Sequence, residues 1–192
     1  MLKYDSGQPI QMPKENMQHN IVNVNIGELK IAHGETIMRA TLGSCVAIAM
    51  VWREKQQCAL AHCFLPSGAD KSPLSGRYVD QAIPNMINLI GLTKESFSKV
   101  EVFLVGGANM MDQLHQKNSY FIGEKNSQLA LTTLQALGLR VSATAVVGSL
   151  AQQIQVECST GQVSVKQLNE GSSGSESKRP TLTVFNFFIR SA

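Results

Sequence analysis

Two apolar runs separated by a short polar segment form the clearest hydrophobic pattern along the chain. Residues 45–52 and 58–64 are apolar, and the polar residues 53–56 lie between them. A short polar gap between two β-compatible runs is the sequence signal of a β-hairpin. In the first run both alternating sets of residues are apolar, so we expect a strand that is covered on both faces.

The length of the connecting loop fixes which residues of this hairpin face each other. Whether the loop consists of the two central residues of 53–56 or of all four, Trp52 pairs with Gln57. Cys45 then lies one diagonal step from His62, and both side chains point to the same face because side chains alternate with period two. Diagonal neighbours have Cα atoms roughly 7–8 Å apart. A slip of one residue would put the pair on opposite faces.

The pattern on either side of the hairpin predicts both strands and helices. Alternating apolar residues indicate one or two strands within 21–31, and helical spacing follows in 78–92, where Pro84 favours a helix start or a bend. Asn126 is a suitable N-cap for a second helix over 127–137. Further strands are predicted at 101–105, ended by Gly106-Gly107, at 139–147, at 154–157, and at 163–168, the last closing a terminal hairpin.

These elements predict a layered α/β (α+β) fold in which sheet packs against sheet or helix. The expected parts are a flexible N-terminal arm (1–20), one folded domain (21–168), a linker rich in Gly and Ser (169–180) and an apolar C-terminal segment (181–192). Two interpretations of that last segment remain open: a final strand that folds back on the domain, or a docking peptide that adds to a sheet edge of a partner.

Composition narrows the class of protein further. The chain has 192 residues, 43% of them hydrophobic and 16% charged, which is typical of a globular domain with a substantial core. A net charge of +3 without long basic runs gives no support to a nucleic-acid partner. No apolar stretch reaches the roughly 18 residues of a membrane span, and the first 20 residues do not resemble a signal peptide, so we expect a cytoplasmic protein without membrane insertion.

Cysteine and histidine are the candidate chemical groups. A cytosolic setting predicts reduced thiols, and the spacing of the four His and four Cys residues does not favour a metal site. A thiol with a usual pKa of about 8.5 needs a base to become a nucleophile at neutral pH, and a neighbouring imidazole supplies one. Gly43 and Ser44, just before Cys45, could offer backbone N–H groups to a developing oxyanion. The alternative is that Cys45 and His62 are ordinary core residues, which is commoner for an arbitrary chain.

Four motifs that follow one another along the chain favour a catalytic role for Cys45 and His62 over a purely structural one. The chain carries TLGSCVAIAM followed by AHCFLP, then GRYVDQA, GGANM and IGEKN, and together they resemble the signature of the chemoreceptor glutamine deamidase family, CheD. The resemblance implies a CheD-like fold, a layered sandwich of mixed β-sheets with helices packed outside, and a protein-glutamine glutaminase without metal or organic cofactor. It implies Cys45 as nucleophile and His62 as its base. It also implies a third catalytic residue, a threonine shortly before the cysteine that would orient His62; we place it at Thr41, with Thr36 as the alternative.

The resemblance also implies partners. The substrate would be glutamine side chains on the helical cytoplasmic part of methyl-accepting chemotaxis receptors, and a further partner would be the chemotaxis phosphatase CheC. Receptor methylesterase activity is a further possibility within the family. The chain departs from the family before its last hairpin, where relatives carry Gly-Gly followed by Arg and this chain has no Arg in residues 147–153.

Two alternative functions and the role of one loop remain open from the sequence. A non-catalytic adaptor would keep the fold and the receptor contact, and a cysteine peptidase or acyltransferase would use the same Cys/His pair on another leaving group. The Gly/Ser/Pro-rich loop 66–76 comes directly from the His62 strand, so it is either a rim over the site or a simple connection.

Overall fold

The computed structural model describes residues 20–69, 72–108, 122–146, 150–168 and 184–187, without the side chains of residues 146 and 184–187. The expected arm up to residue 19 and the expected linker 169–180 lie outside these residues, as do parts of the GGANM motif and of the segment that departs from the family.

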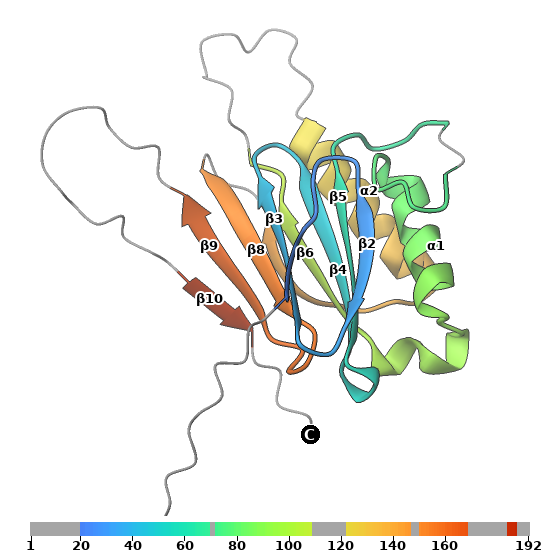
Figure 1. Cartoon of the computed structure of the whole chain (residues 1–192). Coiled ribbons are helices and arrows are strands. Elements are labelled where there is room, and N and C mark those ends of the chain that lie inside the picture. Colours follow the sequence, from blue (N-terminus) through green and yellow to red (C-terminus); the bar gives the residue numbers. More distant parts are fainter. Residues whose placement is uncertain (1–19, 70–71, 109–121, 147–149, 169–183, 188–192) are drawn as a thin grey trace, which may run out of the picture.

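Two five-stranded sheets and two α-helices form three layers (Figure 1). The outer sheet has the order β1-β3-β8-β9-β10 and the central sheet the order β2-β5-β4-β6-β7. Both α-helices pack against the face of the central sheet that points away from the outer sheet. The predicted layered α+β sandwich is confirmed.

The outer sheet contains β1 (Asn20–Asn23), β3 (Thr36–Leu42), β8 (Ala151–Glu157), β9 (Val163–Leu168) and β10 (Val184–Phe187). The predicted terminal hairpin is confirmed, although its first strand starts at Ala151 rather than at Ile154. The strand β10 pairs antiparallel with β9, so residues 184–187 of the C-terminal segment fold back on the domain. Its alternative role as a docking peptide has no support in this pairing.

The central sheet contains β2 (Leu29–His33), β4 (Val46–Trp52), β5 (Gln57–Cys63), β6 (Glu101–Gly106) and β7 (Val141–Val146). Every residue of β4 and β5 is buried, as expected for strands covered on both faces. One face packs on the outer sheet around Phe103, Leu60 and Met38, and the other packs on the helices around Leu104, Ile83 and Leu134. The hairpin therefore lies at the centre of both hydrophobic cores.

The helix α1 (Val79–Ile90) buries the face that contains Ala82, Ile83 and Met86. Pro84 lies inside this helix rather than at its start, on the exposed face, where its missing N–H leaves one carbonyl without its helical donor. Gly91, with φ of 74°, ends the helix in the left-handed conformation. Two short 3-10 helices, η1 (Arg53–Lys55) and η2 (Lys94–Lys99), complete the set.

The helix α2 (Ile122–Leu137) corrects one expectation. Asn126 is not its N-cap but a fully buried residue inside the helix. The described helix already begins at Ile122, and in its first turn Gly123 lies against Gly107: a Cβ on Gly123 would be 2.7 Å from the Gly107 carbonyl oxygen. Only glycine allows this close approach. The expected end at Gly138, with φ of 81°, is confirmed.

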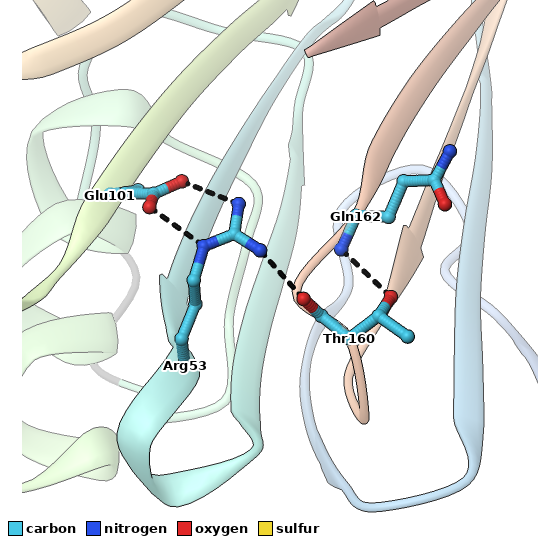
Figure 2. Close-up of polar contacts among 4 residues, drawn as sticks. All are labelled: Arg53, Glu101, Thr160 and Gln162. Carbon is cyan, nitrogen blue, oxygen red and sulfur yellow. Dashed lines mark hydrogen bonds and ion pairs between the residues drawn. The ribbon is translucent and has the colours of Figure 1, made fainter. Parts of the chain in front are cut away.

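Arg53 ties the two sheets together at the end where β4 passes into β5 (Figure 2). Its Nε and Nη2 donate to the two carboxylate oxygens of Glu101 at 2.7 and 2.9 Å, and its Nη1 donates to the Thr160 carbonyl at 2.6 Å in the β8–β9 turn. The turn itself is closed by a bond from the Gln162 N–H to the Thr160 hydroxyl. A bidentate arginine–carboxylate pair is stronger than an ordinary surface ion pair.

Replacement of Arg53 by alanine should therefore destabilise the fold. We expect the free energy of unfolding, measured by urea denaturation, to fall by about 1–3 kcal/mol because three charge-assisted hydrogen bonds are lost. Lys99→Ala removes an exposed pair with Glu54 at 3.3 Å and serves as the control, with an expected loss below about 1 kcal/mol. Equal losses in the two variants would contradict a special role for Arg53.

Candidate active site

The hairpin register brings Cys45 and His62 to one face of the central sheet. Trp52 pairs with Gln57, as predicted, across the four-residue connection 53–56, and Ala47 pairs with His62. Cys45 comes two residues before Ala47, so its side chain and that of His62 point toward the outer sheet. Consistent with this placement, Cys45 packs against the core between the sheets.

Cys45 lies in the turn that enters β4, and two glycines make room for it. Its carbonyl accepts a hydrogen bond from the Gly107 N–H at 2.8 Å, and the Gly43 carbonyl accepts one from the Ala108 N–H at 3.1 Å. A Cβ on Gly106 would come within 2.3 Å of the Cys45 carbonyl oxygen. The Gly-Gly turn after β6 therefore packs directly on the backbone of Cys45, and both glycines have positive φ.

His62 is buried, with 2% of its surface exposed, and its ring is oriented by main chain. Nδ1 lies 3.1 Å from the carbonyl oxygen of Val24. Because a carbonyl oxygen only accepts, Nδ1 carries the proton and donates it. Nε2 has no hydrogen-bond partner among the described residues, so its lone pair is free to accept a proton.

Burial keeps both groups neutral. It raises the pKa of the Cys45 thiol above its usual value. It lowers the pKa of His62, against the smaller opposing effects of the Val24 carbonyl and the Glu28 charge. No hydrogen bond joins Cys45 to His62 in the described part of the chain, so the free protein holds a thiol and a neutral imidazole rather than a thiolate–imidazolium pair.

The two candidate threonines lie at opposite ends of β3. Thr36 opens the strand and its carbonyl accepts a hydrogen bond from the Cys158 N–H, at the end remote from the turn of Cys45. Thr41 lies near that turn, but its side chain is exposed and its hydroxyl accepts a hydrogen bond from the Gln153 amide at 3.2 Å. The ring partner of His62 is thus Val24, and neither threonine is its hydrogen-bond partner in this structure.

A pocket of about 500 Å³ opens beside His62, where the chain crosses from β1 to β2. Thr41 and His62 both line it, whereas Cys45 does not. The other lining residues come from that crossing and from β3: Asn23, Val24, Asn25, Ile26, Arg39 and Ala40. The pocket supplies an approach to the imidazole from the side of the outer sheet.

The loop after His62 runs along the same crossing. Leu74 accepts a hydrogen bond from the Leu29 N–H at 3.2 Å, and the Gly76 N–H donates to the Gly27 carbonyl at 2.9 Å. This part of the loop is therefore tied to the segment that surrounds His62. Its role as a rim stays a prediction.

Sequence reasoning missed the contribution of Val24 and of the residues that follow it. In the sequence Val24 is one of the alternating apolar residues of 21–31, and a main-chain carbonyl has no sequence signal of its own. The available hint was Gly27-Glu28, which interrupts the alternation and marks the place where the chain changes sheets.

The comparisons with known proteins bear on this site. A family model described as CheD chemotactic sensory transduction matches residues 64–167, more than half of the 192-residue chain. The chain belongs to the CheD family. The matched segment begins just beyond His62, so the model match itself includes neither Cys45 nor His62.

Curated relatives extend the CheD match over most of the chain. It is 33% identical over 147 residues to a probable chemoreceptor glutamine deamidase CheD of Bdellovibrio bacteriovorus, covering 76% of this chain and 94% of the relative. Proteins of the same name from Pyrococcus horikoshii and Methanococcus maripaludis are 32% and 31% identical, and each match covers 78% of this chain.

The described residues contain neither a metal-ion cluster nor a membrane-spanning helix. No group of three or more His, Cys, Asp or Glu side chains within them is arranged to hold a metal ion. None of the helices they form has the length and apolar character needed to cross a membrane. All four cysteines are free thiols, and Cys58, Cys63 and Cys158 are buried.

The lowered pKa of His62 predicts a pH-dependent stability. Below the usual value of 6.5, the unfolded chain protonates this residue before the folded protein does, so the free energy of unfolding should fall as the pH drops through the window just below 6.5. Urea denaturation at several pH values should show a smaller loss in His62→Gln. His33→Gln, which changes an exposed histidine at the end of β2, should keep the wild-type slope. An unchanged slope in His62→Gln would contradict the burial effect.

Differences in burial also predict the order of thiol modification. Cys45 is the only half-buried cysteine and the other three are buried, so brief treatment of the folded protein with iodoacetamide should label Cys45 first. Because its pKa is raised, we expect the rate to keep increasing above about pH 9. Peptide mass spectrometry locates the label, and Cys45→Ala is the control. Earlier labelling of Cys63 would contradict the prediction.

Proposed function

We propose that this CheD-family protein is a protein-glutamine deamidase that converts glutamine side chains of chemoreceptors to glutamate and releases ammonia. The single observation that carries the proposal is the placement of Cys45 on the same strand face as His62, whose tautomer leaves Nε2 free to take the thiol proton. The names of its relatives, which describe probable chemoreceptor glutamine deamidases, supply the substrate class.

The proposed reaction has two stages. Nε2 of His62 takes the proton of the Cys45 thiol as Sγ attacks the carboxamide carbon of the substrate glutamine. The tetrahedral intermediate collapses, the imidazolium gives its proton to the departing ammonia, and a thioester remains. Water then attacks the thioester with His62 as general base, which restores the thiol and leaves glutamate. The reaction consumes one water and releases one ammonia.

The turn before β4 is suited to stabilise the oxyanion. The peptide between Gly43 and Ser44 is trans, and its carbonyl is held by the Ala108 N–H. The N–H of Ser44 therefore points to the opposite side, away from Ala108. A main-chain donor fixed in this way needs no rearrangement when negative charge develops. We assign Ser44, with the neighbouring amides of residues 43–45, to this role.

Thr41 keeps a place in the proposal, at the mouth of the pocket beside His62. Its exposed hydroxyl already accepts from Gln153 and retains a proton to donate, which suits contact with the substrate better than orientation of the buried imidazole. The substrate would be the helical cytoplasmic part of a receptor, which places the protein in the cytoplasm. CheC stays within the proposal as a partner. Methylesterase activity stays within it as well, because the same thioester can form from an ester as from an amide.

A second candidate function is a receptor-binding adaptor without catalysis. It is favoured by the raised pKa of Cys45 and by the missing hydrogen bond between its thiol and His62 in the described structure, which leave the nucleophile unactivated in the free protein. A peptidase or acyltransferase would use the same pair, but its products would differ.

The deciding experiment is mass analysis of a receptor cytoplasmic fragment after incubation with wild type, Cys45→Ala and Thr41→Val. Each deamidation adds about 1 Da. We expect modification at specific glutamines with the wild type, a loss of at least roughly 100-fold with Cys45→Ala and a smaller loss with Thr41→Val, because the nucleophile has no substitute. Receptor binding without any mass change would support the adaptor, and cleavage of the fragment would support a peptidase.

A further inference from the structure

The segment that crosses from β1 to β2, residues 23–30, surrounds His62 with three hydrogen bonds. The N–H of Gly27 donates to the His62 carbonyl at 2.9 Å, and the His62 N–H donates to the Glu28 carbonyl at 3.0 Å. The ring Nδ1 donates to the Val24 carbonyl at 3.1 Å. Backbone and ring of His62 are thus fixed by one short stretch of chain.

Glu28 holds the peptide group that orients the ring. The N–H of Asn25 donates to Oε2 of Glu28 at 2.8 Å. That N–H belongs to the same trans peptide as the Val24 carbonyl, and in a trans peptide the two groups point in opposite directions. The carboxylate of Glu28 therefore lies at one end of this peptide and the imidazole of His62 at the other. Hydrogen bonds arranged in such a chain polarise one another.

The rest of the segment keeps this arrangement in place. The Val24 N–H donates to the Arg39 carbonyl at 2.7 Å, which anchors the peptide to β3. Nζ of Lys30 lies 2.7 Å from Oε2 of Glu28 and donates to the Asn23 carbonyl at 2.7 Å. Lys30 and the Asn25 N–H together lower the pKa of Glu28, so its carboxylate is charged at neutral pH.

We propose that Glu28 is a positioning residue for His62. It acts through one peptide group: its carboxylate accepts from the Asn25 N–H, and the Val24 carbonyl of the same peptide accepts from Nδ1 of His62. A carboxylate bonded directly to Nδ1 would have the same effect on the ring. The inference rests on the proposed deamidase function. Glu28 keeps the proton of the neutral ring on Nδ1, which leaves Nε2 as the base, and its negative charge stabilises the imidazolium that forms when Nε2 takes the thiol proton.

The charges around the ring fix the direction of the expected pH effect. Glu28 and Lys30 form an ion pair beside the peptide that binds the ring, Arg39 lines the pocket next to the ring from β3, and Cys45 lies on the same face of the central sheet as His62. Among these, Glu28 raises the pKa of His62. Loss of that charge lowers the pKa of the base, so the acid limb of the rate profile should move to lower pH.

The test compares Glu28→Gln, which keeps an acceptor for the Asn25 N–H but removes the charge, with Glu28→Ala, which removes both. The control is Glu54→Gln, an exposed glutamate beside Lys99 in the β4–β5 connection. With a receptor fragment as substrate, we expect kcat to fall about tenfold in Glu28→Gln and further in Glu28→Ala, a part of the roughly 100-fold or more that a general base contributes. KM should stay within about twofold, and Glu54→Gln should match the wild type.

A second measurement does not depend on activity. Nitrogen NMR of the His62 ring, recorded in a Cys45→Ala background, reports which ring nitrogen carries the proton and the pH at which the ring titrates. We expect the Nδ1-protonated form in the parent, a lower titration midpoint with Glu28→Gln, and a mixture of tautomers with Glu28→Ala. Circular dichroism verifies that each variant is folded.

The two measurements separate the possible failures. An unchanged tautomer and midpoint in both Glu28 variants would overturn the positioning role, whatever the rates. Changed ring spectra in a protein that deamidates no receptor fragment would overturn the proposed function and leave the positioning role supported. If Glu28→Ala fails to fold, the midpoint of Glu28→Gln decides alone.

Discussion

The burial of the β4–β5 hairpin on both faces is the constraint on which the remaining structure depends. One face meets the outer sheet and the other meets the helices, and every residue of both strands is buried. A slip of one residue would turn His62 toward the helices and put Cys63 between the sheets. The register that fills both cores is therefore the register that places His62 on the face of Cys45, so the same packing energy supports fold and site.

The site and the Arg53 interactions that join the two sheets lie at opposite ends of the hairpin. At the end of the site, β4 begins, β5 and β6 end, and both α-helices begin. Gly106 and Gly107 let the main chain approach Cys45 at this end, because a side chain on Gly106 would collide with the Cys45 carbonyl oxygen. At the other end Arg53 joins the central sheet to the β8–β9 turn. Charged groups thus join the two sheets at the end of the hairpin away from the candidate site. At the other end, close packing of the backbone shapes the site.

The burial of Cys45 and His62 has a chemical consequence. Burial disfavours charge on both groups, raising the pKa of the thiol and lowering that of the imidazole. A pair of this kind stores no reactive thiolate in the free protein. In the proposed reaction, proton transfer becomes favourable only as charge develops on the bound substrate and meets fixed main-chain donors. The buried main-chain partner of His62 suits this arrangement, because it selects a tautomer without adding a charge.

The hydrophobic pattern by itself determined the hairpin, its register and its burial on both faces, because side-chain alternation and a short loop leave few alternatives. The motifs determined the family. The local pattern failed at Asn126: a residue type that favours the N-cap is instead fully buried inside a helix that already includes Ile122, because tertiary packing overrides local preference.

Only the tertiary structure decided what orients His62. The resemblance pointed to a threonine side chain, whereas the ring bonds to the carbonyl of Val24, held by a turn in which Glu28 binds the next peptide N–H. Carbonyl groups are the same in every residue, so their use is invisible in a sequence until the chain path is known. That path, from one sheet to the other around His62, follows from packing between distant segments rather than from local preference.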